Sequence, residues 1–290
     1  MSDHDRREID ELSGVETTGH EWDGIKELNN PLPRWWLWTF YATIVWAIGY
    51  TIFYPAWPLV NSATQGILGY SSRAELHQEV GRVQTERAGL NEALATRELS
   101  EILADDALRN FAIAGGAAAY RVNCSQCHGT GAQGGEGYPN LNDDNWIWGG
   151  SIEELHQTIA HGVRDQGDLD THISEMPAFA GVMGRREIAE TAAFVASLSR
   201  EPESPDLVEA GAQHYGDFCA ACHGVGGEGD RLMGAPSLNN PIWLYGGSEA
   251  EIAAQIAQPR HGVMPGWTDR LGDLTVRKLA VFVHSLGGGE

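Results

Sequence analysis

Positive charge is scarce in this sequence of 290 residues. Nineteen lysines and arginines stand against 40 aspartates and glutamates, which gives a formal net charge of −21. Proteins that bind nucleic acid neutralise its phosphates with clustered basic side chains, so this balance argues against a nucleic-acid partner. The acidic surface fits a soluble exported domain, and it is equally compatible with docking to a basic partner.

Cysteine is also scarce, with four residues in all. None is left over for a disulfide framework, because all four lie in two motifs, Cys124-Ser125-Gln126-Cys127-His128 and Cys219-Ala220-Ala221-Cys222-His223. Each motif reads Cys-x-x-Cys-His, the attachment signature of a c-type haem. Thiols three positions apart can add to the two vinyl groups of one porphyrin edge, and the next histidine can then ligate the iron.

A Cys-x-x-Cys pair can also be a redox dithiol or half of a zinc site. A dithiol does not require the adjacent histidine, however, and a zinc site requires further ligands in a tight cluster. Met176-Pro177 and Met264-Pro265 follow the two motifs, and methionine is a common second axial ligand of such haems. The sequence therefore predicts two covalent haem c groups, with His128 and His223 as one pair of axial ligands and Met176 and Met264 as the other.

Other side chains compete for the second axial position. Met183 and Met233 are further methionines, but a proline after the methionine fixes the backbone in an extended turn that can aim the sulfur. His161, His172 and His261 could complete bis-histidine sites, although packing or hydrogen bonding at the haem edge is the favoured role of the first and last. The aromatic residues expected to wall the haem pockets are Trp146, Trp148, Trp243 and Tyr245.

Long apolar runs are absent except at Trp35–Tyr54, which has 20 residues and no charge. A helix of that length spans roughly 30 Å, the thickness of a bilayer core. Tryptophan and tyrosine gather at both ends of the run, as in the aromatic belts of membrane helices. We therefore expect a transmembrane helix over 35–57. The acidic stretch before it, 1–34, is the wrong n-region for a cleavable signal peptide and is expected to be an exposed tail.

The remaining chain divides into a helical connector over 58–115, a first haem domain over 116–200, the linker 201–205 and a second haem domain over 206–290. In the connector, Ser72-Arg73-Ala74-Glu75 reads as a capping box and a second helix is expected from Asp106. An apolar stripe follows the capping box and must cover a partner subunit, the haem domains or the membrane surface; its members are Leu76, Val80, Val83, Leu90 and Leu94.

The second haem domain repeats the first. His161-Gly162-Val163 matches His261-Gly262-Val263, but Met264 follows the second copy directly, whereas Arg164–Glu175 intervenes before Met176. This insertion is a candidate for a contact specific to one domain. The expected fold class is mainly α, with one N-terminal transmembrane helix followed by two tandem class I cytochrome c-like domains. Helices are expected over 117–123, 152–160, 187–198 and 274–286.

The residues around the predicted membrane helix point to a particular family more specifically than the haem motifs do. DGIKELNNPLPRWWLWTFY and the exit YPAWPLV, together with the two haem motifs and their Met-Pro pairs, resemble the membrane-anchored dihaem subunit (CcoP/FixP) of cbb3-type cytochrome c oxidases. Some members of that family carry a second N-terminal span, and this sequence has none. The likeness covers nearly the whole chain.

The resemblance implies an electron-transfer subunit that is not an enzyme by itself. It would accept electrons from a soluble or membrane-bound cytochrome c. It would pass them to a monohaem cytochrome c subunit and on to the haem–copper catalytic subunit, which reduces oxygen to water and pumps protons. The resemblance further implies that the methionines are exchanged, Met176 serving the second haem and Met264 the first. Spacing alone pairs each methionine with its own domain.

Covalent haem attachment takes place outside the cytoplasm, and both haem motifs follow the single span. The chain is thus expected in the bacterial inner membrane with a cytoplasmic N-terminus and periplasmic haem domains. A free-standing, membrane-tethered dihaem electron carrier is the alternative function. A dihaem peroxidase is a weaker alternative, because it requires an iron that lacks or releases its sixth ligand.

Overall fold

A computed structural model describes residues 8–289. The chain falls into two compact units, Met1–Thr85 and Glu86–Glu290. In the first unit, β1 (Thr17–Trp22) and β2 (Ile25–Leu28) form an antiparallel hairpin. Asp23 and Gly24 connect the strands, both with positive φ, as a tight hairpin turn requires. The expected tail therefore contains a hairpin that the Asp-Gly pair could have revealed; its residues 1–7 lie outside the described residues.

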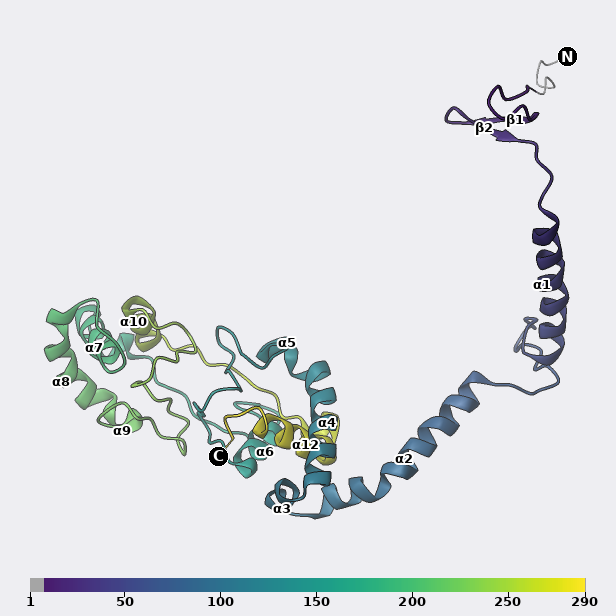
Figure 1. Ribbon diagram of the computed structural model, residues 1–290. Coiled ribbons are helices and arrows are strands. Elements are labelled where there is room, and N and C mark those ends of the chain that lie inside the picture. Colours follow the sequence, from purple (N-terminus) through teal and green to yellow (C-terminus); the bar gives the residue numbers. More distant parts are fainter. Residues whose placement is uncertain (1–7, 290) are drawn as a thin grey trace. The chain divides into compact units, whose positions relative to one another are not determined.

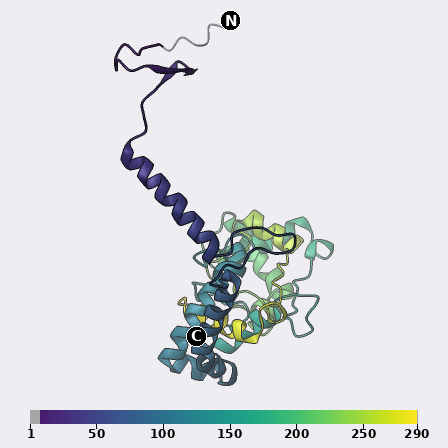
Figure 2. The ribbon, with the colours of Figure 1, turned by 90° about the vertical axis from the view of Figure 1, so that its right-hand side faces the viewer.

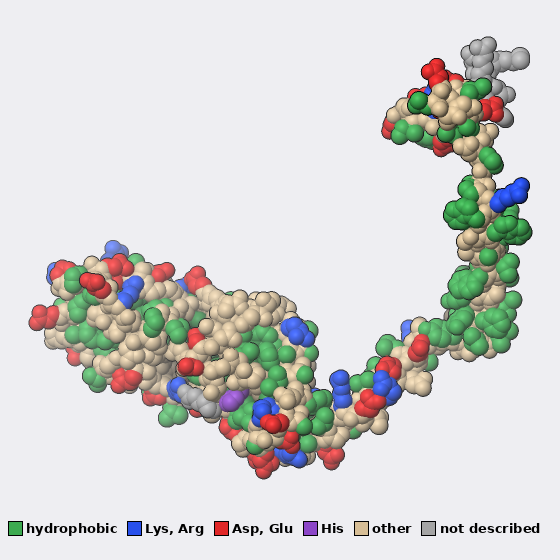
Figure 3. Space-filling view, viewed as in Figure 1, with side chains coloured by type: hydrophobic (Ala, Val, Ile, Leu, Met, Phe, Trp, Pro, Cys, Tyr) green, Lys and Arg blue, Asp and Glu red, His purple; other side chains and the backbone are tan. Residues whose placement is uncertain are grey.

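Helix α1 (Arg34–Phe53) occupies the predicted membrane span and has no buried residue. It is the one helix among residues 8–289 that is long and apolar enough to cross a membrane. Figures 1 and 2 both show it as one continuous helix, and Figure 3 shows hydrophobic side chains over its surface. The helix stops four residues before the expected limit at 57, because Pro55 lacks the N–H that would continue it.

Helix α2 (Ser72–Thr96) follows. The Ala74 N–H donates to the Ser71 hydroxyl at 3.3 Å, so the cap lies one residue before the predicted Ser72. Most of the predicted apolar stripe is open to solvent, and Leu76 is 61% exposed. Leu94, at the far end of the stripe, is fully buried within the second unit's first hydrophobic core. Part of the stripe thus covers the haem-motif region of the chain itself.

The second unit is helical, and its elements are α3 (Leu99–Ala104), α4 (Asp106–Asn123), α5 (Ser125–His128), α6 (Ile152–His161), η1 (Phe179–Gly181), α7 (Arg185–Ser197), η2 (Pro205–Leu207), α8 (Val208–Phe218), α9 (Ala220–His223), α10 (Glu249–Ala257), α11 (Thr268–Leu271) and α12 (Asp273–His284). The expected helices from Asp106 and over 117–123 are one helix, α4, so the boundary predicted at residue 116 falls inside it. The mainly helical prediction is confirmed.

The helices build two hydrophobic cores that do not follow the order of the sequence repeats. The first core combines α4 and α6 with α12, and the second combines α8 and α10 with α7. In Figure 1, α12 lies with α4 and α6, and α7 lies with α8 and α10. Each haem-motif helix therefore packs against the last helix of the other repeat. The ranges 116–200 and 206–290 delimit the repeats, but neither range contains a complete core.

Matching glycines allow these helices to approach closely. A Cβ on Gly116 of α4 would lie 2.1 Å from the Lys278 carbonyl oxygen of α12, and a Cβ on Gly211 of α8 would lie 1.9 Å from that of Glu190 in α7. Next to each crossing, a tyrosine packs on a phenylalanine of the partner helix, with ring centroids 5.3 Å apart in the first core and 5.1 Å in the second. The two crossings are thus equivalent.

Candidate functional site

Each Cys-x-x-Cys-His motif forms one helical turn at the end of a longer helix. In the first, α4 ends at Asn123 and the turn α5 carries Cys127 and His128. The Cys127 N–H donates to the Cys124 carbonyl at 3.1 Å, which turns both thiols and the histidine around one short axis. The second motif repeats this arrangement at the junction of α8 and α9, again with 3.1 Å between the equivalent atoms.

The motif histidines are held in one tautomer. Nδ1 of His128 lies 3.0 Å from the Pro139 carbonyl oxygen, and Nδ1 of His223 lies 2.9 Å from that of Pro236. A carbonyl oxygen only accepts, so each Nδ1 carries a proton and donates it, which leaves Nε2 with the lone pair that binds a metal. Burial lowers the pKa of both imidazoles and favours this neutral, ligating form.

The electrostatics of the cysteines argue against a redox dithiol. Burial raises the pKa of the Cys124 and Cys219 thiols to about 11, whereas reactive dithiols have a lowered pKa. The zinc alternative also lacks support in residues 8–289. The one group of clustered His, Cys, Asp or Glu ligands found there is His161, Asp168 and Asp170, which contains no cysteine.

A single cavity of about 1100 Å³ reaches both motifs. It exceeds the roughly 300–1,000 Å³ of ordinary small-molecule sites. Its wall contains both thiols and the histidine of each motif, together with Met176 and Met264. Thiols, a neutral imidazole and a thioether are the donor set of a haem c, so these residues fit two such groups.

The two methionines lie in the cores opposite to their repeats. Met264 and Cys124 both pack against the first core, whereas Met176 packs against the second core, which includes Cys219. The competing Met183 is only 4% exposed inside the second core and is not part of the cavity wall. Met233 is 44% exposed and does line the cavity.

Two backbone hydrogen bonds hold Met264 beside the first repeat. Val163 and Met264 exchange both backbone hydrogen bonds, at 2.9 and 3.0 Å. A Cβ on Gly162 would lie 2.2 Å from the Met264 carbonyl oxygen, and Gly162 has a φ of +73°, so glycine is needed there on both counts. The second repeat's methionine is thereby tied to the first repeat's loop.

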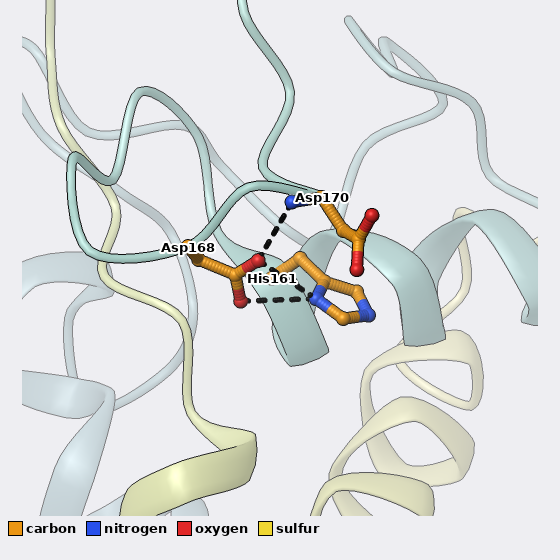
Figure 4. A group of neighbouring side chains, drawn as sticks. All are labelled: His161, Asp168 and Asp170. Atoms are coloured by element: carbon orange, nitrogen blue, oxygen red, sulfur yellow. Dashed lines mark hydrogen bonds and ion pairs between the residues drawn. The ribbon is translucent and has the colours of Figure 1, made fainter.

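The other predicted histidines differ in their surroundings. His261 lines the cavity, but His161 and His172 do not. Nδ1 of His161 lies 2.9 Å from Oδ2 of Asp168, with Asp170 beside the pair (Figure 4). Nε2 of His172 lies 3.1 Å from the Thr158 hydroxyl. The role at a haem edge expected for His161 thus has no support from its position.

All four aromatic residues predicted to wall the pockets do line the cavity. The Trp146 indole N–H donates to the Gly288 carbonyl, and Trp148 stacks on His172 with 4.3 Å between ring centroids. The Arg260 guanidinium lies 4.6 Å from the centre of the Tyr245 ring. Trp243 packs against the second core.

Sequence reasoning missed several residues of this site. The proline acceptors Pro139 and Pro236 follow the motif histidines by 11 and 13 residues, a spacing visible in the repeat. Arg164 also lines the cavity, although the insertion it opens was expected only to make a contact. The exchange of the last helices left no sequence signal, because the two repeats are alike.

Comparison with known proteins identifies the family. A family model for the N-terminal domain of cytochrome oxidase-cbb3, FixP, matches residues 14–61, and one for cytochrome c oxidase, cbb3-type, subunit III matches 111–195 and again 206–283. The chain is 56% identical over 284 residues to a cbb3-type cytochrome c oxidase subunit FixP of Sinorhizobium medicae, with 98% of each chain covered.

Two further relatives agree. Identity is 57% to subunit FixPc of Rhizobium leguminosarum bv. viciae, covering 98% of this chain and 99% of the relative. It is 49% to subunit CcoP of Cereibacter sphaeroides, covering 94% and 95%. With its apolar N-terminal helix and two cytochrome c repeats, the chain belongs to the FixP/CcoP family, the membrane subunit III of cbb3-type cytochrome c oxidases.

Proposed function

We propose that this subunit relays electrons from a cytochrome c donor, by way of two covalent haem c groups, to the oxidase's monohaem subunit and its haem–copper catalytic subunit. The carrying observation is that both Cys-x-x-Cys-His motifs and both Met-Pro methionines line one cavity. A haem c with histidine and methionine ligands supplies a one-electron iron couple and leaves no open position for oxygen. The chain itself therefore performs no oxygen chemistry.

We further propose the ligand sets. Cys124, Cys127, His128 and Met264 would hold the first haem; Cys219, Cys222, His223 and Met176 would hold the second. Support comes from the two cores, since each methionine packs against the same core as a cysteine of the other repeat. The prolines that orient the histidines leave Nε2 free for the iron in both cases.

Single methionine variants test this pairing. Met–iron ligation of ferric haem c gives a weak red absorbance band and a high potential. Met264→Ala should lower the potential of the first haem and spare the second, and Met176→Ala should do the reverse. The haems are told apart by a Cys124→Ala/Cys127→Ala variant that carries only the second. If Met264→Ala alters the second haem instead, each repeat uses its own methionine.

We propose that α1 spans the inner membrane with the hairpin in the cytoplasm. The second unit, Glu86–Glu290, which carries both haem motifs and is called the haem unit below, would then lie in the periplasm. The support is chemical: haem c is attached outside the cytoplasm, and the attachment motifs follow α1. Protease added to spheroplasts should degrade the haem unit and leave the residues before α1 protected. Protection of the haem unit would refute this orientation.

Purification through a tag on this chain in mild detergent tests the relay. Haem b bands and oxygen uptake with reduced cytochrome c should accompany two haem c per chain. If haem c alone appears and no oxygen is consumed, a free-standing tethered carrier becomes the better description. Peroxide turnover by the isolated chain would instead favour the peroxidase.

A further inference from the structure

Arg164 opens the insertion that separates Met176 from the His-Gly-Val triplet of the first repeat. It follows His161-Gly162-Val163, at the position that Met264 occupies after His261-Gly262-Val263. Its φ of +55° lies in the left-handed region, which is costly for a residue with a long side chain. This backbone conformation is retained in the wall of the haem cavity, where the side chain has specific partners.

The guanidinium joins the two segments that carry the methionines. Its Nε donates to the Gly262 carbonyl at 2.7 Å and its Nη1 donates to the Ser174 carbonyl at 2.8 Å. Gly262 lies two residues before Met264, and Ser174 lies two residues before Met176. One planar fork therefore holds the approach to both methionines, and only arginine presents donors in this fixed arrangement.

The Arg164 guanidinium is half-buried and directed at backbone carbonyls. Its acceptors among residues 8–289 are the carbonyl oxygens of Gly262 and Ser174. Burial lowers the Arg164 pKa, and the nearby Tyr245 and Glu175 only partly oppose this. Hydrogen bonds from a charged donor are about twice as strong as neutral ones, so both carbonyls are held firmly.

The backbone supports the two sides unequally. Met264 is also fixed by its ladder with Val163. On the other side, the Arg164 N–H donates to the His172 carbonyl at 2.8 Å, four residues before Met176. Of the two hydrogen bonds that Arg164 makes on this side, the one from its guanidinium to the Ser174 carbonyl lies nearer Met176 in the sequence.

We propose that Arg164 is a positioning residue that fixes both axial methionines at once and so couples the methionine ligation of the two haems. This inference rests on the proposed ligand sets. Loss of the fork loosens both segments, so both methionines leave their irons more readily. The equilibrium constant for methionine binding to iron should fall about tenfold, or about 1.4 kcal/mol, for Met176. It should fall less for Met264, because the backbone hydrogen bonds to Val163 remain.

The test uses the purified full-length chain with both haems attached. Arg164→Ala should weaken the red methionine–iron band at both haems and lower both potentials in an optical redox titration. Arg164→Lys keeps the charge but not the fork, and should weaken the band in the same direction. Arg109→Ala is the matched control: Arg109 also donates to a backbone carbonyl, that of Leu103, but it does not line the cavity, so both bands should persist.

The outcomes separate this inference from the ligand assignment. If Met176→Ala and Met264→Ala each remove one band while Arg164→Ala leaves both, the assignment stands and the role of Arg164 is refuted. A lysine variant identical to wild type would refute the fork, because charge alone would then suffice. If neither methionine variant changes a band, both proposals fail. Should Arg164→Ala not accumulate with haem, Arg164→Lys decides the question.

Discussion

At the scale of single residues, contacts with backbone carbonyls and amides position the ligands. His128 and His223 are oriented by proline carbonyls, and Tyr120 and Tyr215 donate their hydroxyl hydrogens to the carbonyls of Gly129 and Gly224 at 2.9 and 2.7 Å. Backbone acceptors in a packed core have fixed positions, so they hold a ring more accurately than a mobile side chain does. The haem sites are therefore determined largely by backbone geometry.

Asp165 is a carboxylate with a pH-dependent role in this arrangement. Its Oδ2 accepts the Gly266 N–H at 2.7 Å, which ties the insertion to the segment after Met264. Hydrogen bonds from the Gly266 and then the Gly167 N–H lower the pKa of Asp165 below its usual 3.8. Its contribution to stability is thus complete above the unfolded-state pKa and is lost as pH falls through the lower folded-state pKa.

We accordingly predict that Asp165→Asn unfolds more easily than wild type at neutral pH. The difference in the free energy of unfolding between the two proteins should stay constant down to about pH 5 and shrink below about pH 4. At that pH the Asp165 carboxylate of the wild type becomes protonated and is lost as a charged acceptor. Chemical unfolding of the haem-loaded chain at a series of pH values measures this. A difference that grows as the pH falls would contradict a stabilising role of the ionised Asp165 carboxylate.

At the scale of elements, the two helix crossings decide which helices can pair. α4 meets α12 at Gly116, and α8 meets α7 at Gly211, in each case with backbone within reach of an added Cβ. Such a contact depends on the absence of a side chain on one helix. Substitution of either glycine should therefore be costly.

We predict that Gly116→Ala and Gly211→Ala each destabilise the haem unit by about 1–3 kcal/mol, the usual cost of overpacking. Gly89→Ala in α2 is the control, because a Cβ there has no neighbour within 4 Å and alanine favours a helix. Thermal unfolding followed by haem absorbance and far-ultraviolet circular dichroism compares the three. An unchanged midpoint in both crossing variants would show that the helices separate at no cost.

At the scale of the whole molecule, the haem unit is interlocked. The first core requires α12 and Met264 from the end of the chain, and the second requires α7 and Met176 from the first repeat. Arg277 of α12 also donates to the Leu94 carbonyl near the end of α2. The C-terminal helix thus contacts both the connector and α4, the helix that leads into the first haem motif.

It follows that residues 86–200, which contain the whole first repeat, should not fold into a haem domain. Without α12, the apolar face of α4 has no cover, and without Met264 the first haem lacks its sixth ligand. Limited proteolysis and the red band compare this fragment with residues 86–290. A protease-resistant 86–200 fragment with methionine ligation would show that each repeat can close on itself.

The sequence alone determined the chemistry and the class of fold. The spacing within Cys124–His128 and Cys219–His223 specifies covalent haem attachment, because the reaction needs those side chains in one turn. The run of 20 charge-free residues from Trp35 indicates a membrane helix, because a helix of that length spans a bilayer core and carries no charge that would have to be desolvated there. These features are local in the chain, and local patterns are what a sequence displays.

Tertiary structure alone decided which repeat completes which core. The helices α7 and α12 carry equivalent apolar faces, and α4 and α8 carry equivalent glycines, so periodicity cannot tell α4–α7 from α4–α12 pairing. The choice depends on how the loop around Arg164 crosses the segment at Met264, with hydrogen bonds between residues about 100 positions apart. Contacts of that range exist only after the chain has folded, and they set the pairing of the helices and the position of each methionine.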